Sequence, residues 1–155
     1  MLCIGKGTIK FIGSVNLGFF PAPYFLNGYI HLEARSEESS IEIHDGVCMN
    51  NGVAITSDGP GIRIGARTLI GAHCEIIDSD FHDLHPDRRS NGKPKTARVD
   101  IGENVLIGSN VKIMKGVRIG KNAVIANSAV IMRSIPENGM AFGNPAKVGF
   151  GMAQD

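Results

Sequence analysis

The chain has 155 residues, and its 16 Lys and Arg against 15 Asp and Glu give a formal net charge of +1 at pH 7. This length suits a single domain, and the near balance of charge leaves no basic patch of the kind that nucleic-acid-binding proteins carry. No stretch is long and apolar enough to span a bilayer, and the start of the chain lacks the basic residues and long apolar run of a signal peptide, so we expect a cytoplasmic protein.

Residues 1–40 show no clear periodicity. The sequence GKGTIKFIGSV, residues 5–15, is predicted to form a degenerate first coil of the repeat described below. The following LGFFPAPYFLNGY, residues 17–29, is rich in proline and aromatic residues. Because stacked repeats need a terminal unit that covers their open end, we predict an irregular N-terminal cap here.

A six-residue period begins after residue 40. Within residues 41–77 a large apolar residue recurs every six positions, at Ile43, Met49 and Ile55 and again from Ile64 onward. Between residues 99 and 136 the period is unbroken, and Ile101 opens the blocks IGENVL, IGSNVK, IMKGVR, IGKNAV, IANSAV and IMRSIP. A fixed period this short is typical of a parallel β-helix. We therefore predict an all-β fold with coils at 41–77 and 99–136 and a C-terminal tail at 137–155.

The period also predicts which side chains are buried. In each block the first and fifth residues point inward, and the sixth points outward because side chains alternate along a strand. The glycine after the first residue suits a tight corner, and Asn104, Asn110 and Asn122 tolerate left-handed dihedral angles there. If each block is one side of a triangular prism, a coil takes about 18 residues. The predicted inward residues are Ile43, Val47, Met49, Val53, Ile55, Ile64, Thr68, Ile70, Cys74, Ile76, Ile101, Val105, Ile107, Val111, Ile113, Val117, Ile119, Ala123, Ile125, Ala129 and Ile131.

Outward residues 18 positions apart should stack on one face of the prism. A face that exposes Leu and Val argues for a subunit interface. The predicted stacked pairs are Leu106 with Val124, Lys112 with Val130, and Arg118 with Pro136.

The three cysteines, Cys3, Cys48 and Cys74, form no CxxC pair. Their spacing supports neither a disulfide framework nor a zinc site. Cys74 is predicted to point inward and Cys48 outward, so we interpret them as structural thiols.

The period fails between Ile76 and Ile101, and residues 78–98 are predicted to form an extended loop. The loop begins DSDFHDLHPDRRSNGKPK and holds two histidines, His82 and His85. Catalytic groups are often mounted on loops that leave a rigid scaffold. The other histidines fall elsewhere: His73 and His44 at corners or outward positions, and His31 in the irregular N-terminal part.

Three features of the sequence resemble the hexapeptide-repeat acyltransferases, and among them the O-acetyltransferases that act on maltose, galactosides and surface polysaccharides. The first is the repeat itself. The second is a loop of the form His-x-x-[Asp/His]-Pro-x-x-Arg, here His82, His85, Pro86 and Arg89, followed by Asn91-Gly92. The third is the closing sequence IPENGMAFGNPAKV at 135–148. The resemblance, over about residues 41–148, implies a left-handed β-helix that assembles as a homotrimer with active sites between subunits.

In that family the loop histidine, here His82, is the general base that deprotonates an acceptor hydroxyl for attack on the thioester of acetyl-CoA. Imidazole titrates near neutral pH, and a positioned base contributes about 10²–10⁴-fold to the rate. The resemblance implies no metal. Asp78 or Asp80 is expected either to orient the imidazole or to cap a turn, and the sequence leaves that choice open.

The resemblance also suggests binding residues, although Asn50 is equally suited to a coil corner, and His85 and Arg89 to stabilising the loop. The CoA groove of the family lies between adjacent subunits. Acceptor contacts are predicted at Asn50, Asp58, Asp80, His85 and Arg89, and acetyl-CoA contacts at Ser109, Asn127, Met132, Arg133 and Lys147.

Three other functions stay open at this point. An amino-sugar N-acetyltransferase would share the scaffold. A trimeric zinc hydratase of the carbonic-anhydrase type would need three histidines around one metal, for which His73, His82 and His85 are the candidates. A non-catalytic β-helix would have the same fold, because fold does not imply function.

Overall fold

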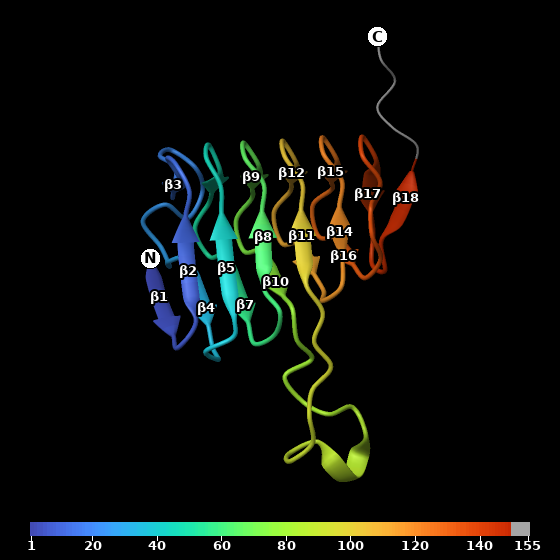
Figure 1. The fold of residues 1–155 in the computed structure, drawn as a ribbon. Coiled ribbons are helices and arrows are strands. Elements are labelled where there is room, and N and C mark those ends of the chain that lie inside the picture. The colour runs from blue at the N-terminus through green and yellow to red at the C-terminus, as the bar shows by residue number, and fades with distance from the viewer. Residues whose placement is uncertain (150–155) are drawn as a thin grey trace.

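The computed structural model describes residues 1–149, in which three sheets form the sides of a triangular prism (Figure 1). Sheet A contains β1 (Leu2–Gly5), β4 (His31–Ala34), β7 (Ala54–Ser57), β10 (Glu75–Ile77), β13 (Lys112–Ile113) and β16 (Val130–Ile131). Sheet B contains β2 (Thr8–Phe11), β5 (Ser40–Ile43), β8 (Ile62–Ile64), β11 (Val99–Ile101) and β14 (Arg118–Ile119). Sheet C contains β3 (Asn16–Leu17), β6 (Cys48–Met49), β9 (Leu69–Ile70), β12 (Leu106–Ile107), β15 (Val124–Ile125), β17 (Met140–Phe142) and β18 (Lys147–Gly149).

The chain visits the three sheets in turn, so each coil adds one parallel strand to each side. In Figure 1 the strands of sheet B run upward on the near side while the coils advance toward the C-terminus, which makes the helix left-handed. The predicted fold class, an all-β left-handed parallel β-helix, is thereby confirmed. Among the strands within residues 1–149, only β18 departs from the parallel order, because it pairs antiparallel with β17.

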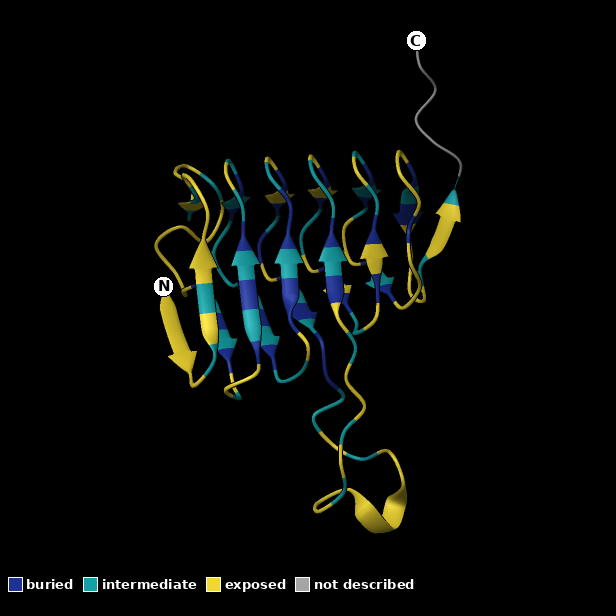
Figure 2. Ribbon diagram, in the orientation of Figure 1, coloured by how far each residue is buried: buried dark blue, intermediate teal, exposed yellow. Residues whose placement is uncertain are grey.

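The core is a set of apolar ladders inside the prism (Figure 2). On sheet A, for example, Ile55, Ile76, Ile113 and Ile131 lie in register on neighbouring strands. All the residues predicted to point inward are buried, including Thr68 and Cys74. The six-residue period therefore predicted the core correctly.

The corners repeat one backbone conformation. The fourth residue of the six-residue block has a positive φ, as at Asn104 (55°), Asn110 (60°) and Asn122 (59°), which confirms the prediction for these asparagines. The glycines that follow the leading Ile lie at tight corners that leave no room for a Cβ, as predicted. A Cβ on Gly102 or Gly120 would lie 2.7 or 2.3 Å from a backbone nitrogen of the next coil, so glycine is needed for close approach of coils.

The last coil is shorter than predicted on sheet B. Ile119 pairs with Ile135, 16 positions later, instead of with a residue 18 positions later. Ser134, and not Pro136, consequently lies beside Arg118, and its Oγ accepts a hydrogen bond of 3.0 Å from the Arg118 N–H. The predicted stacking of Arg118 with Pro136 is wrong, whereas the other two predicted pairs are in register.

The N-terminal region contains a complete first coil, since β1, β2 and β3 each join one sheet. The aromatic segment 17–29 does not cap the open end, contrary to the prediction. Asn51 Nδ2 donates to the carbonyls of Tyr24 and Phe25, and the Tyr24 ring packs on His73, so the segment follows the corner between sheets C and A. Phe11, on an inward position of the first coil, remains 41% exposed.

One excursion leaves the prism, at the corner between sheets A and B (Figure 1). Residues 78–98 connect β10 to β11 and contain the 3₁₀-helix η1 (Pro86–Arg88). Within residues 1–149 no helix has the length and apolar character that crossing a membrane requires. The predicted tail at 137–155 includes β17 and β18, and its residues 150–155 lie outside the described part of the chain.

Candidate active site

The base of the loop is tied to the prism by Asp78. This buried carboxylate accepts hydrogen bonds from Ser57 Oγ (2.7 Å) and from the N–H groups of Asp58 (2.8 Å) and Gly61 (2.9 Å). These three donors belong to the corner of the preceding coil. Three donors on one carboxylate satisfy a buried charge, so Asp78 fixes the point at which the loop leaves the scaffold.

His82 lies just beyond this base and is exposed. Its Nδ1 is 3.1 Å from the carbonyl oxygen of Arg89, across the loop. Because a carbonyl can only accept, this contact requires the proton on Nδ1 and leaves the lone pair on Nε2. No residue in the described part of the chain hydrogen-bonds to Nε2, so the ring is arranged to accept a proton there.

The orienting group is therefore a backbone carbonyl and not a carboxylate. The carboxylates of Asp78 and Asp80 make no hydrogen bond to the His82 imidazole. Asp80 Oδ1 instead forms an ion pair with Lys115 Nζ at 2.6 Å. Its Oδ2 is buried without a hydrogen-bond partner among the described residues.

The rest of the loop is organised around Asp83. Its carboxylate accepts from the His85 N–H (2.9 Å) and from Arg88 Nε (2.9 Å), and the Arg88 guanidinium lowers the pKa of that carboxyl below its ordinary value. His85 caps η1, because its Nδ1 accepts from the Asp87 N–H at 3.3 Å. The sequence left open whether His85 and Arg89 contact the acceptor or support the loop, and the contacts they make here, through the His85 ring and the Arg89 carbonyl, lie within the loop.

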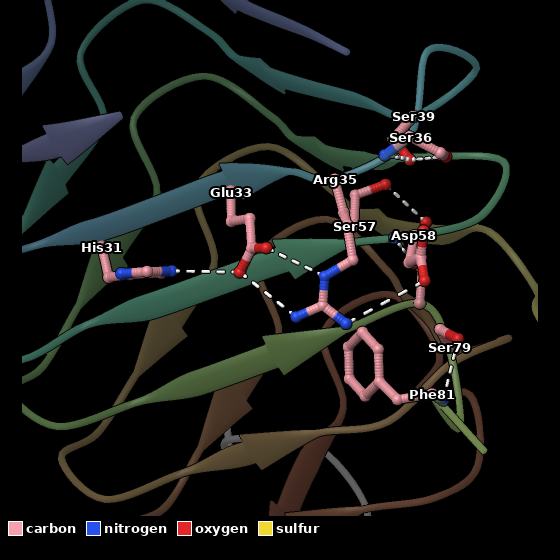
Figure 3. Close-up of polar contacts among 10 residues, drawn as sticks. His31, Glu33, Arg35, Ser36, Ser39, Ser57, Asp58, Ser79 and Phe81 are labelled. Atoms are coloured by element: carbon pink, nitrogen blue, oxygen red, sulfur yellow. Dashed lines mark hydrogen bonds and ion pairs between the residues drawn. The ribbon is translucent and has the colours of Figure 1, made fainter. Parts of the chain in front are cut away.

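A polar cluster on the outer face of sheet A lies next to the loop (Figure 3). Glu33 Oε1 accepts from Arg35 Nε at 2.8 Å, and Glu33 Oε2 is 3.3 Å from His31 Nε2. The hydrogen bond from Arg35 is the main cause that lowers the pKa of Glu33, and the pKa of Arg35 is raised in return. Arg35 also approaches Asp58 at 4.0 Å and stacks over the ring of Phe81 at 4.7 Å.

Sequence reasoning missed this cluster because His31 was assigned to an irregular segment. His31 is the first residue of β4, and its outward position alternates with the buried Leu32. The period-two pattern of HLEAR, with polar residues at 31, 33 and 35 around apolar ones, was the available signal.

A groove of about 410 Å³ runs over sheet C toward its corner with sheet A. Asn50, Ser109 and Asn127 line it together, and Asn127 Oδ1 accepts from the Ser109 N–H at 2.8 Å. The groove thus brings two predicted CoA residues together with one predicted acceptor residue. Apolar side chains, among them Leu69 and Leu106, form the remaining wall.

The other predicted site residues do not lie close together within a single chain. Asp58 lies at the corner between sheets A and B, near the loop, whereas Asn50 lies at the corner between sheets C and A. Met132 and Arg133 follow β16, and Lys147 lies on β18, and all three are exposed. A single chain therefore presents the loop histidine and the groove on different corners of the prism.

The zinc alternative finds no geometric support. Among residues 1–149, no three side chains of His, Cys, Asp or Glu are gathered closely enough to hold a metal ion. His73 packs against Tyr24 at one corner, while His82 and His85 lie on the loop at another.

Both the sequence repeat and the fold of this chain are similar to those of known acetyltransferases. The family described as bacterial transferase hexapeptide (six repeats) matches residues 98–133. A hexapeptide-repeat acetyltransferase from Vibrio cholerae is 26% identical, with a TM-score of 0.69 over 95% of this chain and 73% of that one. No curated protein sequence matches the chain significantly.

Two further solved structures are similar. A galactoside acetyltransferase in complex with coenzyme A is 28% identical, with a TM-score of 0.53 over 93% of this chain and 64% of that one. A maltose O-acetyltransferase from Clostridium difficile 630 shares the fold, with 24% identity and a TM-score of 0.64 over 97% of this chain and 70% of that one. The chain thus spans about two thirds to three quarters of each of these proteins.

Proposed function

Because the chain belongs to the hexapeptide-repeat acyltransferases, we propose that it transfers an acetyl group from acetyl-CoA to a hydroxyl of a sugar, with His82 as the general base. The observation that carries the proposal is the contact between His82 Nδ1 and the Arg89 carbonyl at 3.1 Å. That contact selects the tautomer in which Nε2 can take a proton. The similar Vibrio cholerae and galactoside acetyltransferases support the donor and the acceptor class.

The reaction follows from this tautomer. Nε2 removes the proton of the acceptor hydroxyl as its oxygen attacks the thioester carbonyl. The tetrahedral intermediate collapses, the C–S bond breaks, and the imidazolium gives its proton to the departing CoA thiolate. The Arg89 carbonyl faces the Nδ1–H throughout and so keeps the ring in one orientation during both proton transfers.

The groove over sheet C is the proposed site of acetyl-CoA. Ser109 and Asn127 line it, and its apolar wall suits a pantetheine chain. The exposed cations Arg133 and Lys147 are proposed to meet the phosphates as charge-assisted donors, with Met132 beside them. Acceptor contacts are proposed for Asn50, Asp58 and Asp80.

We also propose a homotrimer, for two reasons. The outer face of sheet C is apolar, with Leu69 49% and Leu106 47% exposed in the single chain. In addition, the loop with His82 and the groove lie on different corners, so the loop of one subunit must meet the groove of the next to complete a site. His85 and the Arg89 side chain, both exposed, are then available to a neighbour's acceptor.

The assembly can be tested with Leu106→Glu. This change places a charge on the apolar face and should convert the trimer to monomers in sedimentation equilibrium, with a loss of activity. Lys112→Glu on sheet A, also exposed on a short strand, is the matched control and should stay trimeric. A wild-type chain that sediments as a monomer while fully active would contradict the proposal.

The catalytic role is tested by thiol release from acetyl-CoA. His82→Ala should lower the rate by about 10²–10⁴-fold, with an unchanged circular dichroism spectrum. His73→Asn is the control, because Asn tolerates the φ of 58° at that corner and a zinc site would need His73. Equal rates for His82→Ala and wild type would refute the assignment.

A panel of acceptors tests whether the acetyl group is transferred to a hydroxyl or to an amine, and to which class of saccharide. Neutral saccharides, polysaccharide fragments and amino sugars are offered in parallel, and the product is identified by mass spectrometry as ester or amide. An ester on a saccharide hydroxyl is the expected product. Amide products alone would show an N-acetyltransferase instead. A preference for polysaccharide fragments over free sugars would support a role in surface-polysaccharide modification. A cytoplasmic location is also proposed, and it fits the three cysteines, which are all free.

A further inference from the structure

The residue before His82 has an unusual backbone conformation. Phe81 has a φ of +57°, and the His82 N–H donates to the carbonyl of Asp80 at 2.7 Å. These two features define a tight three-residue turn centred on Phe81. Bulky side chains rarely adopt positive φ, and tight turns of this kind are strained. Such a conformation persists only where the surroundings hold it.

Three contacts hold this turn. The Phe81 N–H donates to Ser79 Oγ at 2.9 Å. Asp80, one residue earlier, is fixed by Lys115 of the following coil at 2.6 Å. The Phe81 ring lies under the guanidinium of Arg35, 4.7 Å from its centroid (Figure 3).

Arg35 is itself immobilised at the end of β4. Its Nε and Nη2 donate to the two oxygens of Glu33 at 2.8 and 3.3 Å, and Asp58 lies at 4.0 Å. Two carboxylates already balance its charge, so the guanidinium is poorly suited to binding an anionic ligand. Its flat face is instead available to the aromatic ring, the usual geometry of a cation–π contact.

We propose that Arg35 and Phe81 form a positioning pair that sets the orientation of His82, an inference that rests on the proposed role of His82 as the base. The pair connects the second coil to the turn, while the Asp80–Lys115 ion pair connects the turn to the fifth coil. His82 follows directly, and its ring reaches the Arg89 carbonyl only if the turn keeps its shape. Arg35 acts through His82 and does not touch the reacting atoms.

The first test uses steady-state kinetics on Arg35→Ala, Arg35→Lys and Phe81→Ala. Loss of the pair should lower kcat by about 10- to 100-fold, as misplacement of a catalytic group does, with less than a twofold change in KM for acetyl-CoA. Lysine keeps a cation over the ring and should restore part of the rate. Arg118→Ala removes an exposed arginine from sheet B, for which the described residues show no side-chain partner, and should leave kcat unchanged.

The second test separates positioning from a general effect on folding. In the His82→Ala background, Arg35→Ala should cause no further loss of rate, because a residue that acts through His82 has nothing left to position. An equal loss in both backgrounds would overturn the proposal. So would a normal kcat for Arg35→Ala in the wild-type background.

The third test does not depend on activity. Nitrogen-15 NMR of the His82 ring should report the Nδ1–H tautomer in the wild type and a mixture of tautomers in Arg35→Ala. If His82→Ala retains full activity but the tautomer still changes in Arg35→Ala, the proposed function fails and the positioning pair stands. If the tautomer is unaffected, the positioning pair is wrong whatever the reaction.

Discussion

The regular coils and the loop at 78–98 are built in opposite ways. From β11 to β16 each coil repeats the same inward residues and the same corner conformation, and its backbone N–H groups donate to the next coil. Beyond its buried base the loop is largely exposed (Figure 2), and it depends on single contacts such as those of Asp78 and Asp83. Stability therefore resides in contacts that are repeated many times, whereas the proposed chemistry resides in contacts that occur once.

The largest expected effect is a loss of stability, without a loss of activity, when a core residue of the coils is truncated. Ile113→Ala removes a fully buried side chain between β10 and β16 and should lower the free energy of unfolding by about 2–5 kcal/mol. Urea denaturation followed by circular dichroism measures this loss. Activity per folded molecule at low temperature should be unchanged.

The loop supplies the contrast. Leu84→Ala changes a side chain that is 64% exposed and should alter the free energy of unfolding by less than about 0.5 kcal/mol. If Leu84→Ala destabilised the fold as much as Ile113→Ala, the loop would contribute as much to stability as the coils do, contrary to our expectation.

A medium effect is expected where coils approach most closely. The added Cβ of Gly120→Ala would lie 2.3 Å from the Glu137 nitrogen, so the coils must separate locally. Overpacking of this kind typically costs about 1–3 kcal/mol. Lys121→Ala, at the exposed neighbouring position, is the control, and equal melting temperatures for the two variants would show that the glycine is not required for packing.

The smallest effect concerns the acid range. Arg35 lowers the pKa of Glu33, so the pair contributes stability above the ordinary carboxyl pKa of about 4.3, and this contribution is lost as pH falls through the lowered value. Glu33→Gln should be less stable than wild type at neutral pH, by no more than about 1 kcal/mol because the arginine of the pair is exposed to solvent. The difference should vanish in strong acid, and melting curves from pH 7 to pH 2 measure it. A difference that grew toward low pH would contradict the assignment.

The sequence was informative wherever the structure is periodic. The inward ladder from Ile101 to Ile131 and the left-handed corners at the asparagines were predicted because each depends on the local repeat. The need for glycine at positions 102 and 120 was predicted as well, but the neighbour that a Cβ would meet was not, since it depends on the distance to the next coil. The segment 17–29 was misplaced for a related reason: its partners, Asn51 and His73, belong to later coils and leave no local signal.

His82 shows the same division at the proposed site. The repeat pattern alone shows that the period fails after Ile76 and that a histidine follows in the excursion. The folded chain is needed to see that the Arg89 carbonyl, and not the carboxylate of Asp78 or Asp80, faces its Nδ1, and that Arg35 reaches the turn before it. A sequence repeat depends on residues that are close together in the chain. These contacts instead join residues that become neighbours only when one coil is stacked on another and the loop folds back on itself.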